Sequence, residues 1–160
     1  MSDADPEIRE TRPDSAEGLV LIRALDADLR RRYPNSAING LHPQDLEDPR
    51  LIFVVARVEG RAVGCGAVRE HERGVGEVKR MFVLPDVRGR GIARQLLASL
   101  EVIARARGYS VLRLETGSRQ PEAIGLYESA GYRKITPFGE YIGNALSVCF
   151  EKELPTRSTN

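Results

Sequence analysis

The sequence has little of several features that would assign it directly to a class of protein. Its 160 residues include only two cysteines, and these show no spacing typical of a metal site. No apolar run approaches the roughly 20 residues that a membrane-spanning helix needs. The chain also has no marked excess of charge of one sign, because 24 basic and 23 acidic residues leave a formal net charge of +1. That balance gives no general drive toward nucleic acid or an anionic membrane, so neither is expected as a partner.

The cysteines and the first residues together indicate a compartment. Cys65 and Cys149 lie in apolar, strand-like runs, which predicts buried, reduced thiols, with a disulfide or a redox role as the alternative. Met1 to Pro6 lack the basic-then-apolar pattern of a signal peptide. We therefore expect a cytoplasmic protein. Because 41% of the residues are hydrophobic, the chain is expected to form one domain over residues 1–160, with a core at about 7–152 and loose termini.

The first half of the chain reads as one helix and several strands. An apolar stripe at helical spacing follows an N-cap at Asp14 or Ser15, and Pro34 ends that helix. The stripe is expected at Leu19, Ile22, Leu25 and Leu29. Strands are predicted at 7–12, 51–58, 62–68 and 77–83, a polar turn at 71–76, and a loop at 34–50 with at most a short helix at 44–47.

The second half alternates helices and strands. Helices are predicted at 91–107 and 122–130, strands at 111–114, 132–135 and 145–152, and a loop at 136–144. Three antiparallel strands followed by a β-α-β unit predict an α/β fold with a mixed sheet. Helices are expected on both faces of that sheet.

One stretch combines features of an anion site. The strand that ends at Val83 leads through Pro85 into Arg88-Gly89-Arg90-Gly91-Ile92-Ala93, and a helix then begins. The first backbone N–H groups of a helix have no internal partner and lie at the positive end of its dipole, where a phosphate can bind. Gly89 and Gly91 allow the backbone to approach such a ligand closely. The string lacks the P-loop pattern and the three-glycine spacing of a dinucleotide fold.

The pattern R-x-x-G-x-A in that string resembles the acyl-coenzyme A loop of the GNAT superfamily of N-acetyltransferases. The predicted order of elements is similar to that of the family over about residues 7–152. The resemblance implies a central mixed sheet of about six to seven strands, acetyl-coenzyme A as co-substrate and no metal. It places the cofactor against Met81, Phe82, Val83, Arg88, Gly89, Arg90, Gly91, Ile92, Ala93 and Gln120.

Tyr127 is the candidate acid for the departing thiolate. It lies in a run from Ala123 to Tyr132 that resembles the A-x-x-L-Y-x-x-x-G-[FY] motif of the family, whose tyrosine reaches the coenzyme sulfur. Packing is the alternative, because Ala123, Leu126 and Tyr127 share a helical face. The family often has asparagine seven residues before this tyrosine, and this sequence has Gln120 there.

Glu77 is the candidate general base. It precedes Val83 by six residues on the predicted central strand, a spacing similar to the catalytic glutamate of the histone-acetyltransferase branch. An ion pair with Lys79 or Arg80 is the alternative. Glu115 and a water chain are further choices, and a backbone N–H near Val83 would stabilise the oxyanion. His42 and His71 lie in predicted polar loops, where catalysis is the minor interpretation.

The sequence contains little information about the acceptor substrate. The loop from Pro137 to Tyr141 is a candidate lining of its pocket, in which Glu140 could hold a cationic substrate, and a plain strand connection is the alternative. The resemblance implies transfer of an acetyl group to a primary amine of a small molecule or a protein. The alternatives are a non-catalytic acyl-coenzyme A sensor and an unrelated phosphate-binding protein. Dimers are common in the family, so a homodimer is compatible with the resemblance.

Overall fold

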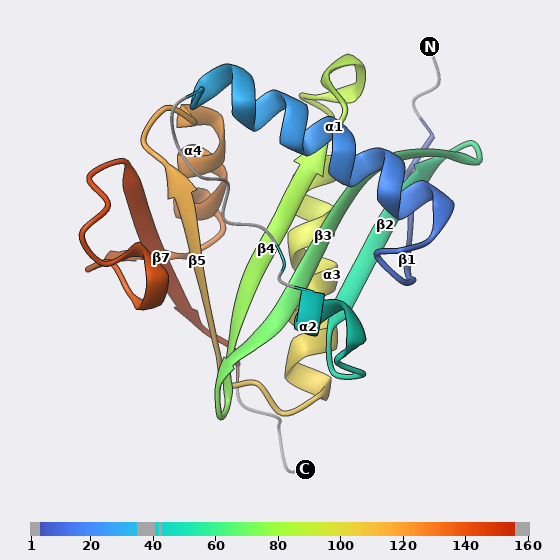
Figure 1. The fold of residues 1–160 in the computed structure, drawn as a ribbon. Coiled ribbons are helices and arrows are strands. Elements are labelled where there is room, and N and C mark those ends of the chain that lie inside the picture. The colour runs from blue at the N-terminus through green and yellow to red at the C-terminus, as the bar shows by residue number, and fades with distance from the viewer. Residues whose placement is uncertain (1–3, 35–40, 42, 156–160) are drawn as a thin grey trace.

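The computed structural model describes residues 4–34, 41 and 43–155, and Figure 1 shows one mixed sheet with helices on both sides. In the described residues the sheet has seven strands, in agreement with the six to seven expected, and their order is β1-β2-β3-β4-β5-β7-β6. Neighbouring strands are antiparallel except β4 and β5, which are parallel. The elements are β1 Glu7–Glu10, α1 Ala16–Arg32, α2 Pro43–Glu47, β2 Ile52–Val58, β3 Arg61–Glu72, β4 Val75–Val83, α3 Ile92–Ala106, β5 Val111–Gly117, α4 Pro121–Ser129, β6 Arg133–Ile135 and β7 Ser147–Glu153.

The sheet separates two apolar layers. In the first, Leu21 and Leu25 of α1 pack with Phe53 and other residues of the facing strands. In the second, Leu96 and Leu100 of α3 pack on the opposite face, and α4 adds its own apolar side chains there. Figure 1 accordingly shows α1 in front of β3 and β4, with α3 behind them. No helix in the described part of the chain combines the length and the apolar character needed to cross a membrane.

Two details of the sequence prediction were wrong. In α1 the buried stripe runs through Leu21 and Leu25, whereas Leu19 is 41% exposed, because the helix is turned so that Leu19 faces outward beside Leu46. The predicted turn at 71–76 is also too long. Strand β3 continues to Glu72 and pairs it with Val75. Only Arg73 and Gly74 form the turn, in which Gly74 has a φ of 79°.

Both cysteines are buried and free, as predicted. Cys65 lies in the α1 layer of the core, and its thiol donates to the carbonyl oxygen of Arg80 at 3.2 Å. Cys149 lies on β7 beside Phe138 and Tyr141.

Gly117, at the end of β5, allows α1 to approach the sheet. A Cβ at this position would lie 1.7 Å from the hydroxyl oxygen of Tyr33. That hydroxyl accepts a hydrogen bond from the backbone N–H of Arg119 at 2.9 Å. The contact fixes the end of α1 against the β5–α4 connection, next to the region where β4 and β5 end.

Gly117→Ala is expected to lower the free energy of unfolding by about 1–3 kcal/mol, because the new methyl group must displace the buried Tyr33 ring. Gly125→Ala is the matched control. Gly125 lies inside α4, and a Cβ there meets nothing within 4 Å, so alanine should stabilise by about 0.5–1 kcal/mol. Urea unfolding of the two variants measures both effects. Equal free energies of unfolding for Gly117→Ala and Gly125→Ala would show that the Tyr33 ring can move aside at no cost.

Candidate active site

Strands β4 and β5 lie side by side over only part of their length. Their parallel pairing runs from Val75↔Val111 to Val78↔Leu114, although β4 continues to Val83 and β5 to Gly117. Figure 1 shows the two strands diverging toward their carboxyl ends. Ligand sites in open α/β sheets form at such ends.

A β-bulge in β4 sets the direction of the side chains at this opening. Arg80 has a φ of 59°, in the left-handed region that non-glycine residues seldom adopt. The pairs Cys65↔Phe82 and Ala67↔Lys79 leave Gly66 opposite both Arg80 and Met81. Bulges of this kind re-aim side chains next to functional sites. Here Met81 packs with the α3 layer, whereas the ammonium group of Lys79 lies over the ring of Tyr141.

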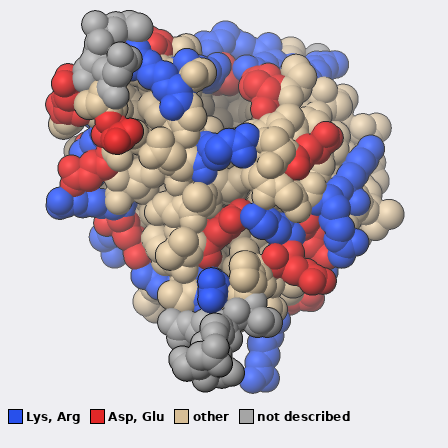
Figure 2. Space-filling model, turned by 180° about the vertical axis from the view of Figure 1, so that it is seen from behind, with Lys and Arg blue, Asp and Glu red and all other residues tan. Residues whose placement is uncertain are grey.

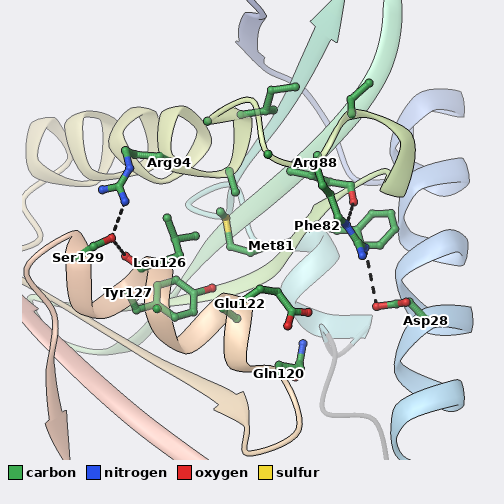
Figure 3. Close-up of a pocket in the computed structure, with 18 of the residues that line it drawn as sticks. Asp28, Met81, Phe82, Arg88, Arg94, Gln120, Glu122, Leu126, Tyr127 and Ser129 are labelled. Carbon is green, nitrogen blue, oxygen red and sulfur yellow. Dashed lines mark hydrogen bonds and ion pairs between the residues drawn. The ribbon is translucent and has the colours of Figure 1, made fainter.

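A cavity of about 410 Å³, here called the loop cavity, lies between the loop before α3 and helix α4 (Figure 3). Nine of the ten predicted cofactor-binding residues line it: Met81, Phe82, Val83, Arg88, Gly89, Gly91, Ile92, Ala93 and Gln120. Arg90 is not among its lining residues. The lining also includes residues that the sequence did not single out, among them Asp28, Arg94, Glu122 and Ser129.

The loop and the first turn of α3 have the geometry of an anion site. Gly89 and Gly91 have φ values of 82° and 78°, which favour glycine. Gly91 is the N-cap of α3, and no described side chain caps this helix end. A Cβ at either glycine would meet nothing within 4 Å, so both face open space. The first N–H groups of α3 are therefore available to a phosphate or pyrophosphate.

Arg88 forms part of the wall of the loop cavity. Its Nε donates to the carbonyl oxygen of Val83 at 2.9 Å. Its guanidinium lies 5.6 Å from the centre of the Phe82 ring, and one of its terminal nitrogens is 3.9 Å from Asp28. Figure 3 shows this side chain running from the loop toward Asp28. The positive charge thus stays close to the loop at the open end of β4.

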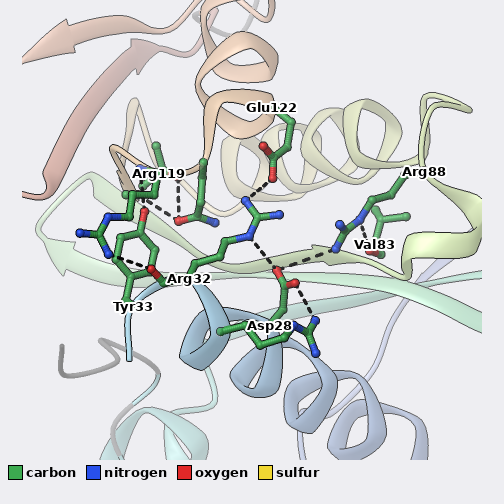
Figure 4. Close-up of polar contacts among 11 residues, drawn as sticks. Asp28, Arg32, Tyr33, Val83, Arg88, Arg119 and Glu122 are labelled. Atoms are coloured by element: carbon green, nitrogen blue, oxygen red, sulfur yellow. Dashed lines mark hydrogen bonds and ion pairs between the residues drawn. The ribbon is translucent and has the colours of Figure 1, made fainter. Parts of the chain in front are cut away.

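Ionic contacts join α1 to α4 across this region (Figure 4). Arg32 pairs with Asp28 of its own helix and with Glu122 of α4. The Arg119 side chain donates to the backbone carbonyl of Arg32 at 3.0 Å. Arg32 is therefore not a solvated charge at the end of α1, since its side chain is only 24% exposed.

Tyr127 lies where the loop cavity meets a second cavity. Its side chain is buried between the rings of Tyr132 and Phe150. Figure 3 shows its hydroxyl group directed toward Met81. Burial, followed by the nearby Glu115 carboxylate, raises the pKa of Tyr127 above its ordinary value. The hydroxyl therefore keeps its proton at neutral pH and can act as a donor.

The second cavity, here called the strand cavity, occupies about 110 Å³ in the opening between β4 and β5. It shares Leu25, Met81, Gln120, Ala123 and Tyr127 with the loop cavity. Its remaining lining residues are Leu29, Val78, Lys79, Arg80, Glu115, Thr116 and Tyr141. Two ligands, one in each cavity, would therefore meet beside Tyr127.

Glu115 is the one carboxylate among the lining residues of the strand cavity. Ser147 donates a hydrogen bond of 2.6 Å to its carboxylate. Burial is the largest influence on its ionisation and raises the pKa above its ordinary value, although the Ser147 bond and Lys79 act in the opposite direction. A buried carboxylate with a raised pKa is suited to take up a proton near neutral pH.

Glu77, the predicted base, lies behind the strand cavity and lines neither cavity. Its side chain is 1% exposed and accepts hydrogen bonds from Arg69 and from the hydroxyl of Tyr141. Lys79 stands 3.8 Å away. Because Tyr141 and Lys79 both line the strand cavity, Glu77 is linked to that space through the tyrosine hydroxyl and the Lys79 ammonium.

Other polar candidates have structural partners. Glu140 pairs with Lys79 at 3.1 Å. Partial burial opposes ionisation of Glu140, but this cation outweighs it and holds the pKa below its ordinary value. His71 packs edge-on against Phe138, and His42 lies outside the described residues. Within the described part of the chain, no group of three or more acidic, histidine or cysteine side chains is arranged to hold a metal ion.

A family model described as Acetyltransferase (GNAT) family matches residues 20–132. The chain therefore belongs to the GNAT acetyltransferase family, and it is an acetyltransferase. The opening between β4 and β5, with the glycine loop at its edge, is the candidate active site.

The individual relatives agree with this assignment. The chain is 47% identical over 135 residues to the IAA acetyltransferase of Azospirillum brasilense, covering 84% of this chain and 88% of that protein. A candidate acyl-CoA N-acyltransferase from Klebsiella pneumoniae has a solved structure with a TM-score of 0.79 and 40% identity, covering 93% of this chain and 97% of that one. A candidate acetyltransferase from Salmonella typhimurium, solved with acetyl-CoA, shares the fold with a TM-score of 0.68 at 19% identity, over 98% of each chain.

Proposed function

We propose that this protein transfers an acetyl group from acetyl-CoA directly to a primary amine. The observation that carries the proposal is the junction of the two cavities beside Met81 and Tyr127. The loop cavity would hold the coenzyme, with its phosphates at the first turn of α3. The strand cavity would hold the amine. A solved structure of the same fold contains acetyl-CoA, which supports this choice of co-substrate.

In the proposed reaction, the amine nitrogen attacks the thioester carbonyl carbon and the C=O electrons move to the oxygen. A backbone N–H of the Met81–Val83 stretch would stabilise this oxyanion, since that stretch lines the loop cavity. The intermediate then breaks its C–S bond, and the departing sulfur takes the hydroxyl proton of Tyr127. The acetylated nitrogen loses its extra proton, and this proton restores the Tyr127 hydroxyl. The amide product and free coenzyme A remain.

The amine must also lose its proton. An alkyl amine with a pKa near 10.4 is mostly protonated at neutral pH, and presenting it neutral costs roughly 4–5 kcal/mol. We propose Glu115 as the base, because its carboxylate lines the strand cavity. The second route uses Glu77, with Tyr141 accepting a proton from the amine while giving its own proton to Glu77.

Acetyl-CoA binding tests the coenzyme site. Gly91→Ala places a methyl group where a ligand would approach α3 and strains a residue that has a φ of 78°, so calorimetry should show at least about a tenfold loss of affinity. Gly108→Ala is the matched control. Gly108 lies at the opposite end of α3, with a φ of 94° and nothing within 4 Å of its Cβ position. The affinity of this variant for acetyl-CoA should therefore remain unchanged.

Thioester consumption then tests catalysis. Release of free coenzyme A is followed with a panel of amines, amino acids, polyamines and peptides. Acetylation of at least one amine is expected. Binding of acetyl-CoA without turnover of any amine would favour the non-catalytic sensor. Failure to bind acetyl-CoA would contradict the assignment of the loop.

A further inference from the structure

We infer that the amine acceptor carries an anionic group, such as a carboxylate, close to its reacting nitrogen. This inference rests on the proposed function and assigns the substrate class of the same site. It follows from the charges on the wall of the strand cavity. Lys79 and Arg80 line that wall next to each other, and Glu115 is the one carboxylate that does so. On the wall itself, one carboxylate therefore faces two cations.

Arg80 has an unused hydrogen-bond donor. Its side chain is only 7% exposed, and its terminal nitrogen pairs with Asp26 of α1. Its buried Nε has no hydrogen-bond partner among the described residues. A buried donor without a partner is unfavourable, and the left-handed backbone of Arg80 adds strain. A guanidinium group binds carboxylates through two adjacent donors. In this inference, the Nε of Arg80 supplies such a contact to the anionic group of the acceptor.

Lys79, the residue just before the bulge, adds a second cation to the same wall. Its side chain is 3% exposed, and its ammonium lies between Glu140, at 3.1 Å, and Glu77, at 3.8 Å. These carboxylates stand behind the cation and do not line the strand cavity. They hold the Lys79 ammonium group in place. The Lys79 ammonium also lies over the Tyr141 ring, 5.7 Å from its centre, so the charge is presented at a fixed position.

The strand cavity therefore suits an acceptor with two opposite ends. The amine would lie toward Glu115 and Tyr127, where the acetyl group arrives. The anionic group would lie toward Lys79 and Arg80. The volume of about 110 Å³ restricts the enclosed part to a compact molecule. A small amino acid fits this description, whereas a polyamine would bring a second positive charge toward the two cations.

The test compares acceptors that differ only in charge. Glycine, L-alanine and L-serine are each compared with their amides, and putrescine represents cationic amines. For wild type, kcat/KM corrected for the fraction of neutral amine should be about tenfold or more higher for the amino acid than for its amide. Arg80→Gln and Lys79→Gln should each reduce this ratio toward one, mainly through KM for the amino acid. The KM for acetyl-CoA should stay unchanged.

Asp26→Asn is the matched control. It removes the ion-pair partner of Arg80 and leaves the cation at the cavity, so the preference for the amino acid should be retained. If wild type acetylates the amides or putrescine at least as well as the amino acids, the inference is wrong, although the proposed function would stand.

Equilibrium binding separates the inference from catalysis. Titration of the same compounds into protein saturated with coenzyme A should give tighter binding of amino acids than of amides, even where no amine turns over. Absence of turnover together with this preference would contradict the proposed function alone. Equal binding of both compounds would overturn the inference.

Discussion

Tyr127→Phe is expected to lower kcat by about 10²-fold while leaving acetyl-CoA affinity close to that of wild type. General acids contribute about 10²- to 10⁴-fold. The lower end applies here, because a thiolate with a pKa near 8.5 leaves fairly well without help. The ring remains in place, so the packing against Tyr132 and Phe150 is kept. Turnover is measured by release of free coenzyme A, and affinity by calorimetry.

Tyr132→Phe provides the matched control. Its ring lies 5.8 Å from that of Tyr127, but its hydroxyl donates to Glu101 at 2.9 Å and the residue lines neither cavity. This variant should lose stability and keep its kcat. Equal effects of the two substitutions on kcat would assign Tyr127 to packing and remove it from the proposed mechanism.

Glu115→Gln is expected to lower kcat/KM by about 10²-fold or more at neutral pH, because the amide cannot accept the amine proton. The pH profile gives a sharper result. A base acts only when it is deprotonated, so wild-type kcat/KM should rise with pH through the pKa of Glu115. Burial raises that pKa, so the acid limb should lie above the ordinary glutamate value of about 4.3. The variant should lack this limb.

The stability of Glu115→Gln should not fall with its activity. A carboxyl group whose pKa is raised by folding favours the folded state at low pH, and this contribution is lost as pH rises through the folded-state pKa. Glu115→Gln removes the cost of burying a charge, so the variant should be at least as stable as wild type at neutral pH. Thermal unfolding across pH measures this difference. An inactive variant that is also unstable would point to a structural role.

Glu77→Gln and Tyr141→Phe distinguish the second route for the proton. If Glu77 acts through Tyr141, both variants should lose activity and both should lose the same limb of the pH profile. If Glu115 is the base, Tyr141→Phe should keep that limb, because Ser147 and the position of Glu115 are unchanged.

The sequence was sufficient where the signals are local. The glycine loop, the amphipathic α3 and the Leu126-Tyr127 motif each lie within one short stretch, and the structure brings the loop and Tyr127 to one cavity. The antiparallel run from β2 to β4 and the parallel pair of β4 and β5 followed from short connections and the crossover helix, whereas the place of β7 between β5 and β6 was not predicted. The burial of both cysteines also followed from their apolar neighbours.

The sequence was insufficient where distant residues or irregular backbone decide the geometry. Glu77 and Glu115 both read as carboxylates on central strands. Only the separation of β4 from β5 and the bulge at Arg80 determine which of them lines the strand cavity. The ion pair between Arg32 and Glu122 joins residues that are 90 positions apart, and no local sequence pattern predicts it. A buried arginine with a positive φ likewise contradicts local preferences, and such conflicts concentrate at functional sites.

The limited pairing of β4 with β5 also gives the molecule two arms. Strands β1 to β4 with α1 form one arm, and β5 to β7 with α4 form the other. Four residue pairs join the two strands at one end, and the contacts of Arg32 with Glu122 and of Tyr33 with Arg119 bridge the two arms at the open end. The width of the space between the arms is therefore set from both ends.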